Sequence, residues 1–206
     1  MAATLRRLLV QRAARLQERP ALTAPGWGTL SYGQFRNRVE GVALGLLAAP
    51  CPTGTAVFLT EPSPWTWAAE VAAACCGLRW EAEGECLDPA LLGGTRFNSE
   101  EGRGPYHDRE DAVHGGLPFH GGLDQEAVLA RLVRLNGRLG WDHDSRIALP
   151  LEHLATPEVR AALWSALYAG AHADFGPAGS GPRRWFSRVE APAPFDAAPF
   201  VDFWKA

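Results

Sequence analysis

The sequence has no long hydrophobic run. A membrane-spanning helix needs about 20 consecutive apolar residues, and no stretch of the 206 residues approaches that length. The opening MAATLRRLLV holds arginines inside its apolar stretch and lacks a small-residue cleavage site, which excludes a secretory signal. An arginine-rich, acid-poor start is also typical of a transit peptide, but the regular spacing of the leucines favours a folded helix. We therefore expect a cytoplasmic protein without membrane contact.

A large net charge is also absent. The formal charge is −3 and 47% of the residues are hydrophobic, which is typical of a globular chain and excludes general disorder. Five arginines line one side of the expected first helix: Arg6, Arg7, Arg12, Arg15 and Arg19. In a chain of nearly neutral charge, a solvated helix face explains such a row. The sequence contains no internal repeat and no nucleic-acid-binding motif, so we expect no nucleic-acid partner.

Paired cysteine motifs are missing as well. The chain has four cysteines, none of them in a CxxC arrangement. Cys75 and Cys76 are adjacent at the expected end of a helix, which is a poor position for a bridge. We expect reduced, intracellular thiols, with Cys75 and Cys76 packed in the core.

The clearest local pattern lies in residues 145–175. A short apolar run, 147–151, precedes a polar turn, and Thr156 with Pro157 supplies the residue types preferred at the N-cap and first position of a helix. Apolar residues then recur at helical spacing until Gly170, and a second short apolar stretch follows. Strand, helix and strand in this order predict a right-handed parallel crossover.

Similar patterns precede it. The expected elements are a helix at 4–19, a hairpin at 21–24 and 29–30, a helix opened by the Ser31–Gln34 capping box, a strand at 55–60, a helix at 63–76, a strand at 78–82 and a helix at 124–140. Strands that alternate with helices predict an α/β fold with a mainly parallel sheet and helices on both faces.

Two segments interrupt this rhythm. Residues 1–176 are interpreted as a single α/β domain, with an irregular insertion at 84–122 that is rich in glycine and charge. Residues 177–206 form a tail rich in proline and aromatic residues: Trp185, Phe186, Phe195, Phe200, Phe203 and Trp204. Because so many aromatic side chains are costly to leave in water, we expect them to dock on the sheet or on a partner, either a protein or a second copy of the chain.

Two segments of the chain resemble the N-terminal domain of adenylate-forming enzymes, the AMP-binding or acyl-CoA synthetase family. In residues 21–83, ALTAPGWGTLSYGQFRNRVEGVALGLLA and TAVFLTEPSPWTWAAEVAAACCGLRW resemble the opening hairpin, long helix, strand and alanine-rich helix of that family. In residues 123–175, ALPLEHLATPEVRAALWSALYAGAHADF resembles its P-L-x-H turn and the helix and strand that follow. The two segments cover about half of the chain in the family's order.

The resemblance implies a reaction in which ATP and a carboxylate give an acyl-adenylate, usually followed by transfer to coenzyme A. In the family, a Ser/Thr/Gly-rich loop ending in Pro-Lys-Gly precedes the helix that starts here at Asp124, and its hydroxyls, amides and lysine hold the phosphates. This chain has HGGLPFHGGL, residues 114–123, in that place. Four glycines remain, Gly115, Gly116, Gly121 and Gly122, without Ser, Thr or Lys.

Phe119 and His120 stand where the lysine and its neighbour are expected, so the fixed charge that offsets triphosphate is missing. The family motifs for adenine, Mg²⁺ and ribose are not found after Phe175. We therefore expect a degenerate phosphate loop, no catalytic residue, and neither ATP nor Mg²⁺ as a bound cofactor.

One position of the family's site is retained. In the family, the histidine after the P-L-x turn borders the acyl-substrate pocket, so the resemblance implies a substrate-binding role for His153. The alternative is a hydrogen-bonded histidine at the end of a strand.

A metal site is not expected. Five metal-capable side chains gather in one stretch: His107, Asp108, Asp111, His114 and His120. Their spacing is too loose for a structural zinc site.

These observations leave three functional hypotheses. The first is a non-catalytic relative of acyl-CoA synthetases that serves as a binding or protein-interaction module. The second is one subunit of a split adenylate-forming ligase, with the missing motifs on another polypeptide. The third is a carrier of a small carboxylic acid or acyl ligand, which would be held beside His153.

Overall fold

The computed structural model describes residues 4–48, 52–58, 63–81, 84–87, 113–176 and 195–205. Its strands are β1 (Pro20–Ala24), β2 (Gly28–Ser31), β3 (Ala56–Phe58), β4 (Arg79–Trp80), β5 (Glu85–Cys86), β6 (Pro118–His120), β7 (Leu123–Asp124), β8 (Arg146–Ala148) and β9 (His172–Asp174). Its α-helices are α1 (Leu5–Leu16), α2 (Tyr32–Ala48), α3 (Pro64–Cys76), α4 (Gln125–Leu139) and α5 (Pro157–Ala169), and two short 3₁₀ turns are η4 (Leu151–His153) and η6 (Ala198–Phe200).

The described strands form three sheets. The largest has the order β2-β1-β9-β8, in which β1 and β2 are an antiparallel hairpin while β1, β9 and β8 are parallel. A second sheet has the order β4-β3-β5 with parallel pairs, and β6 and β7 form a separate hairpin. The fold is thus mixed α/β with mainly parallel strands, as the sequence predicted.

Helix ends follow the capping residues that the sequence indicated. The side chains of Thr4, Asp124 and Thr156 accept hydrogen bonds from backbone N–H groups in the first turns of α1, α4 and α5. The capping box at the start of α2 is formed, because the Ser31 N–H donates to Gln34 Oε1 and the Gln34 N–H donates to Ser31 Oγ.

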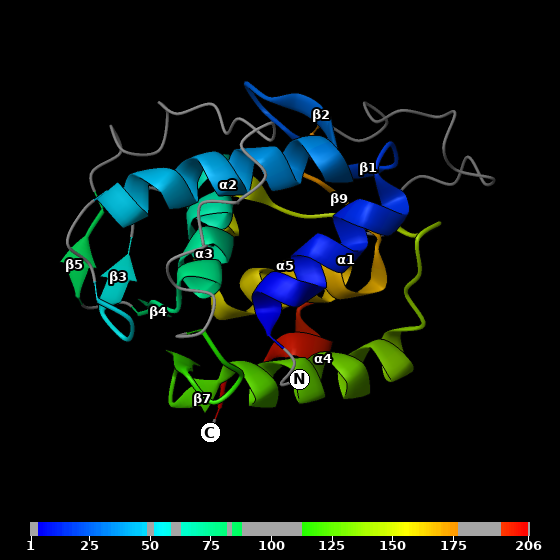
Figure 1. Cartoon of the computed structure of the whole chain (residues 1–206). Coiled ribbons are helices and arrows are strands. Elements are labelled where there is room, and N and C mark those ends of the chain that lie inside the picture. Colours follow the sequence, from blue (N-terminus) through cyan, green and yellow to red (C-terminus); the bar gives the residue numbers. More distant parts are fainter. Residues whose placement is uncertain are drawn as a thin grey trace.

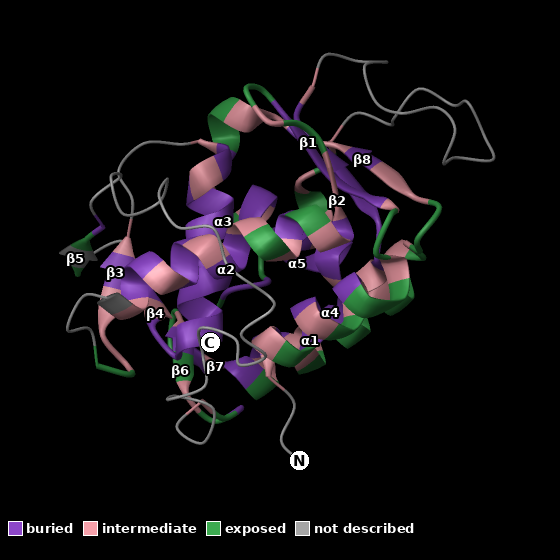
Figure 2. Cartoon of the chain, turned by 45° about the horizontal axis from the view of Figure 1, so that its top comes forward, coloured by how far each residue is buried: buried purple, intermediate pink, exposed green. Residues whose placement is uncertain are grey.

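Residues of α2, α3 and α5 pack against one face of the four-stranded sheet. Leu22 of β1 and Ala173 of β9 meet residues of α2, α3 and α5 across a narrow gap, and the Tyr32 hydroxyl donates to the carbonyl of Ala171 at 2.7 Å. Figure 1 shows α2 crossing above α3, with α1 and α5 beside them. In Figure 2 the buried residues run continuously through α3, α5 and the inner sides of the other helices. Cys75 and Cys76 are buried at the end of α3, as expected.

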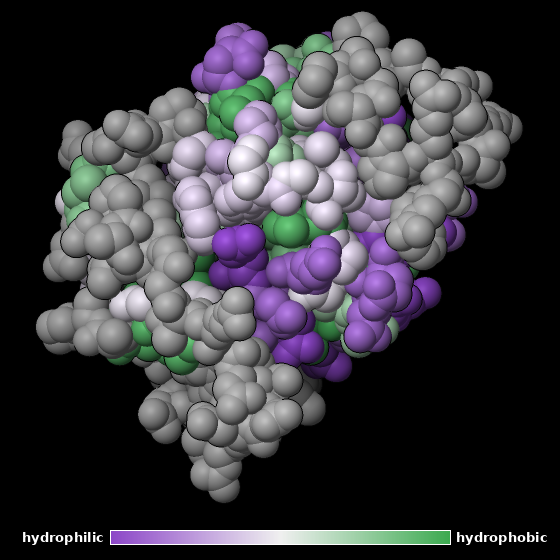
Figure 3. Space-filling view, turned by 90° about the horizontal axis from the view of Figure 1, so that it is seen from above, coloured by the Kyte–Doolittle hydropathy of each residue, from purple (hydrophilic) through white to green (hydrophobic). Residues whose placement is uncertain are grey.

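The outer side of this layer is more polar. Seen from above, hydrophilic residues gather over the middle of the face on which α2 lies (Figure 3). Among the helices of the described residues, none is both long and apolar enough to cross a membrane.

Three details differ from the sequence prediction. The parallel pairs β3–β4 and β8–β9 belong to two sheets, whereas the sequence predicted a single one. The insertion at 84–122 contains regular structure, since β5 and β6 lie within it. The strand expected at 147–151 ends at Ala148, because Pro150 cannot continue the ladder and Leu151 begins η4.

Candidate functional site

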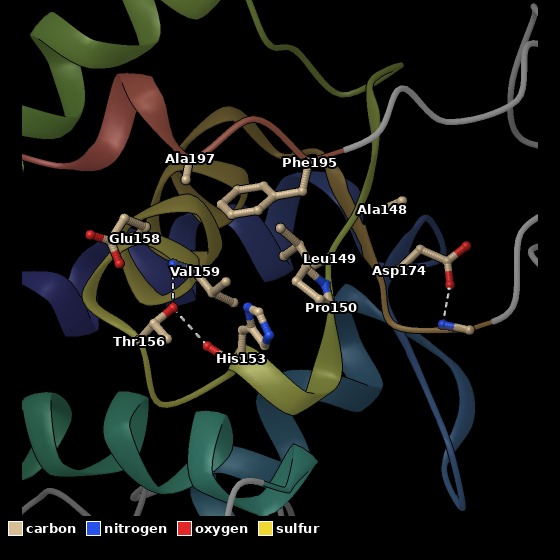
Figure 4. Close-up of a pocket in the computed structure, with 11 residues that line it drawn as sticks. Ala148, Leu149, Pro150, His153, Thr156, Glu158, Val159, Asp174, Phe195 and Ala197 are labelled. Atoms are coloured by element: carbon tan, nitrogen blue, oxygen red, sulfur yellow. Dashed lines mark hydrogen bonds between the residues drawn. The ribbon is translucent and has the colours of Figure 1, made fainter.

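A pocket of about 590 Å³ opens at the carboxyl ends of β8 and β9. Its walls come from the turn after β8, the first turn of α5, the end of β9 and the segment around Phe195 (Figure 4). In open α/β sheets, ligands bind outside the carboxyl ends of parallel strands. The β8–α5–β9 crossover therefore builds a candidate binding site from the segment that the sequence singled out.

His153 borders this pocket from η4 (Figure 4). Its carbonyl accepts hydrogen bonds from the N–H and the hydroxyl of Thr156, both at 2.8 Å. The Thr156 hydroxyl in turn accepts from the N–H of Val159. The helix cap thus fixes the backbone of His153, while its side chain stays exposed at the rim, where a ligand can reach it.

Acidic and apolar groups share the rest of the lining. Leu149, Val159 and Phe195 supply apolar surface. Asp174 is only 2% exposed, and its carboxylate accepts from the Arg146 guanidinium and, at 2.8 Å, from the N–H of Gly176. Arg146 therefore offsets the charge of Asp174, and Glu158 is a second acidic side chain in the lining.

The sequence HGGLPFHGGL folds into the β6–β7 hairpin in front of α4. Gly121 and Gly122 form its turn with φ of 56° and 80°, a pair of values that favours glycine in two-residue hairpin turns. Gly115 and Gly116 lie before β6, and the Gly115 carbonyl accepts from the N–H of Glu126 in α4. The four glycines thus belong to a closed hairpin, which is linked to α4 by a backbone hydrogen bond.

Two side chains of this hairpin point into the protein. Phe119 is fully buried and packs edge-on against Trp164 of α5, with ring centroids 5.6 Å apart. Nδ1 of His120 donates to the carbonyl of Trp80, and Nε2 accepts from Nη1 of Arg160 at 3.2 Å. The positions where the sequence suggested a lost lysine therefore hold core contacts between the hairpin, β4 and α5.

The contacts of His120 belong to a buried polar network. Arg160 and Glu70 form an ion pair through two hydrogen bonds of 2.8 and 2.9 Å, with side chains 8% and 1% exposed. The indole N–H of Trp164 donates to Glu70 at 2.8 Å, and the Trp204 ring lies 5.0 Å from the guanidinium carbon of Arg160. The network joins α3, α5, the hairpin and the C-terminal segment.

Sequence analysis missed this network. The available signal was Glu70, the one charged residue of the helix PWTWAAEVAAACC, and Arg160, the one basic residue of the helix PEVRAALWSALYA. Buried charges are found paired, so opposite charges on two buried helices predict an ion pair if the helices face each other.

The network keeps His120 neutral. Burial lowers the pKa of His120 below its ordinary value, and the nearby Arg160 guanidinium lowers it further. A neutral imidazole matches the hydrogen bonds described, since one nitrogen donates and the other accepts. His120 therefore provides no positive charge at neutral pH.

The helix that follows the hairpin starts with acidic groups. The Asp124 carboxylate accepts from the N–H of Ala127 at 2.7 Å, and Glu126 also lies in the first turn of α4. A helix N-terminus attracts anions through its N–H groups and its dipole, and here carboxylates already use that attraction.

Lys205 is the one lysine of the whole chain, and it pairs with Asp202 at 2.6 Å.

The other sequence candidates lie only partly within the described residues. Among the described residues, no group of three or more His, Cys, Asp or Glu side chains is placed to hold a metal ion. His107, Asp108 and Asp111 lie outside the described residues.

A second buried histidine lies on the sheet. His172 of β9 is 1% exposed, and its Nε2 is 2.8 Å from the Thr23 hydroxyl, which contacts the Thr29 hydroxyl at 2.8 Å. Burial lowers the pKa of His172 to about 4, although Asp174 opposes the shift.

This shift predicts a stability that depends on pH. Between pH 6.5 and about 4 the unfolded chain binds a proton at His172 that the folded chain does not bind. We expect the free energy of unfolding to be highest above pH 6.5, where His172 is neutral in both the folded and the unfolded chain. It should fall by about 3 kcal/mol as the pH drops to 4. Urea unfolding at several pH values in this range should show that the free energy of unfolding falls less for His172→Gln than for the parent. An equal dependence on pH in both proteins would contradict the role of His172.

No protein-family model and no curated protein matches the sequence, but solved structures match its fold. The N-terminal subdomain of NpsA from Klebsiella oxytoca, in complex with anthranilyl-AMSN, matches with a TM-score of 0.64 and 14% identity, over 89% of this chain and 55% of that one. The N-terminal domain of FACL13 from Mycobacterium tuberculosis matches with a TM-score of 0.60 and 13% identity, over 84% of this chain and 56% of that one.

A long-chain-fatty-acid CoA ligase from Rhodopseudomonas palustris matches with a TM-score of 0.58 and 14% identity, over 84% of this chain and 57% of that one. The chain spans somewhat more than half the length of these proteins. At such identities the likeness shows the fold, which is that of the N-terminal domain of acyl-CoA ligases and related adenylation enzymes, as the sequence resemblance predicted.

Proposed function

We propose that this chain, which has the fold of an adenylate-forming N-terminal domain, is a ligand-binding module that does not form acyl-adenylates by itself. The observation that carries the proposal is the β6–β7 hairpin. It occupies the sequence position of the phosphate loop, and its Phe119 and His120 are committed to core contacts. The pocket beside His153 is, in contrast, open and lined for a ligand.

The triphosphate of ATP does not fit the groups present at the hairpin. The hairpin has no hydroxyl and no lysine, and His120 is neutral and turned inward. The carboxylates of Asp124 and Glu126 at the start of α4 would repel phosphate. Without a fixed positive charge, the transferring phosphate would lack the stabilisation that this chemistry requires. We therefore assign no catalytic step to the chain.

The pocket fits a small carboxylic acid or acyl ligand. Its apolar side chains would cover a hydrocarbon or aromatic body, and the exposed imidazole of His153 would donate a hydrogen bond to the carboxylate or carbonyl. Glu158 at the rim disfavours a second negative charge. We therefore expect monocarboxylic acids to bind better than dicarboxylic acids.

Thermal unfolding in the presence of carboxylic acids, acyl-CoAs and nucleotides tests this function. A ligand at about 100 times its Kd stabilises by about 2.7 kcal/mol, which corresponds to a rise in Tm of roughly 5 to 10 °C. We expect such a rise with an apolar monocarboxylic acid and none with ATP and Mg²⁺. His153→Ala should weaken binding at least about tenfold, the loss of one hydrogen bond to a charged group.

Glu152→Ala is the matched control, because Glu152 is the exposed neighbour of His153 and does not line the pocket. If His153→Ala and Glu152→Ala bound the carboxylic acid with equal affinity, His153 would have no role in ligand binding. ATP-dependent release of pyrophosphate with any of the acids would overturn the non-catalytic assignment. A rise in Tm with ATP alone, without turnover, would instead favour one subunit of a split ligase.

A further inference from the structure

Helices α1 and α4 are rich in arginines. The two helices carry seven of them and a single acidic residue, Glu126, while the whole chain has a net charge of −3. The starts of the two helices are joined by a hydrogen bond from the N–H of Leu5 to the Gln125 side chain, and residues of both helices line one groove. They therefore form one strongly basic face on a molecule that is net acidic elsewhere.

Two grooves with apolar floors follow this face. One, of about 650 Å³, lies between α1 and α4, where Arg7, Arg12 and Arg15 stand over Leu8 and Leu129. Arg12 and Arg15 are three positions apart and therefore lie on the same side of α1, and Arg7 lines the same groove one turn earlier.

The second groove lies on the other flank of α4. It has a volume of about 670 Å³ and is bounded by Arg131, Arg134 and Arg138 on the helix and by Phe203 in the C-terminal segment. Val133, also on α4, is 54% exposed.

Four arginines of this face have no charged partner among the described residues. The exposed side chains of Arg7, Arg15, Arg134 and Arg138 form no hydrogen bond or ion pair with another described residue. Arg131 donates to the backbone carbonyls of Phe203 and Lys205, which are uncharged acceptors. The charge of Asp202, the acidic residue of the second groove, is matched by Lys205.

We propose that the α1–α4 face binds an acidic amphipathic helix of a partner protein. Such a helix places apolar residues in a groove and carboxylates against the arginine rows, which combines helix-in-groove recognition with charge complementarity. A flat anionic membrane fits less well, because in the described residues only Val133 and Val201 are large hydrophobic side chains with high exposure. An extended nucleic acid would also meet the acidic remainder of the molecule.

The test uses a synthetic helix of about four turns, with glutamates on one face and leucines on the other, and a twin with glutamine in place of glutamate. Fluorescence anisotropy with the full-length protein should show binding of the acidic peptide that weakens as salt is raised. We expect R134Q/R138Q to weaken it at least about tenfold. N37E/T53E, on exposed positions of α2 and the turn before β3, changes the net charge equally and should leave binding unchanged.

Each other outcome counts against the proposal. No measurable binding of the acidic peptide, equal binding of its glutamine twin, or equal losses in both double variants would overturn it. Tighter binding of duplex DNA or of vesicles containing anionic lipid would assign the face to a different partner. Circular dichroism of both variants should show that the helices are retained, because the four substituted side chains are exposed.

Discussion

Replacement of Arg160 by methionine is expected to lower the free energy of unfolding by roughly 3 to 5 kcal/mol. The substitution leaves the Glu70 carboxylate, which is 1% exposed, buried without its cation. It also removes the donor to Nε2 of His120 and the guanidinium that faces Trp204. For a chain of this size the loss corresponds to a fall in Tm of about 10 °C or more.

The double variant E70Q/R160M separates the buried charge from the packing. The glutamine oxygen still accepts from the indole N–H of Trp164, and no buried charge remains, so we expect most of the lost stability to return. Asp144→Asn breaks the solvent-exposed pair with Arg19 and serves as the control, with an expected cost below about 1 kcal/mol. Urea unfolding of the parent, E70Q, R160M and E70Q/R160M gives the coupling energy between Glu70 and Arg160. An R160M protein as stable as the parent would mean that the network contributes nothing.

Trp204→Ala is expected to have an effect of similar size. Trp204 is 7% exposed, its ring contacts the rings of Phe119, His120 and Phe203, and its indole N–H donates to the carbonyl of Pro157 at 2.8 Å. Truncation of a buried tryptophan to alanine costs about 3 to 5 kcal/mol. We therefore expect the C-terminal segment to act as part of the core, with a matching loss of resistance to limited proteolysis.

Two further variants make this result interpretable. Trp204→Phe keeps an aromatic ring but loses the hydrogen bond, so we expect it to cost about 1 kcal/mol for the bond plus a smaller packing loss. Val201→Ala alters a side chain in the same segment that is 48% exposed, and its effect should stay within about 0.5 kcal/mol. If Trp204→Ala matched Val201→Ala, the segment would be peripheral to the fold.

The C-terminal segment also links the candidate sites. Phe195 and Ala197 line the pocket beside His153, Phe203 lines the second basic groove, and Trp204 covers the buried network. The sequence indicated that the aromatic residues of 177–206 would dock, either on the sheet or on a partner. Phe200, Phe203 and Trp204 are buried against the chain itself, while Trp185 and Phe186 lie outside the described residues.

The hairpin before α4 marks the limit of what sequence reasoning could reach. The sequence HGGLPFHGGL shows directly that serine, threonine and lysine are absent, and a phosphate loop requires those side chains. The new role of Phe119 and His120 was not visible, since it depends on Trp80, Arg160 and Trp164, which are distant in sequence.

The sequence by itself determined the local structure of this protein: Thr4, Asp124 and Thr156 begin helices, and Gly77, Gly140 and Gly170 end them, because these preferences depend on neighbours along the chain. Tertiary structure alone decided that Glu70 meets Arg160, that the parallel strands divide into two sheets, and that grooves form beside the arginines of α1 and α4. The reason is physical. Burial, ion pairing and surface charge depend on how helices pack against one another, and a pattern of residues along one helix records only which of its faces is apolar.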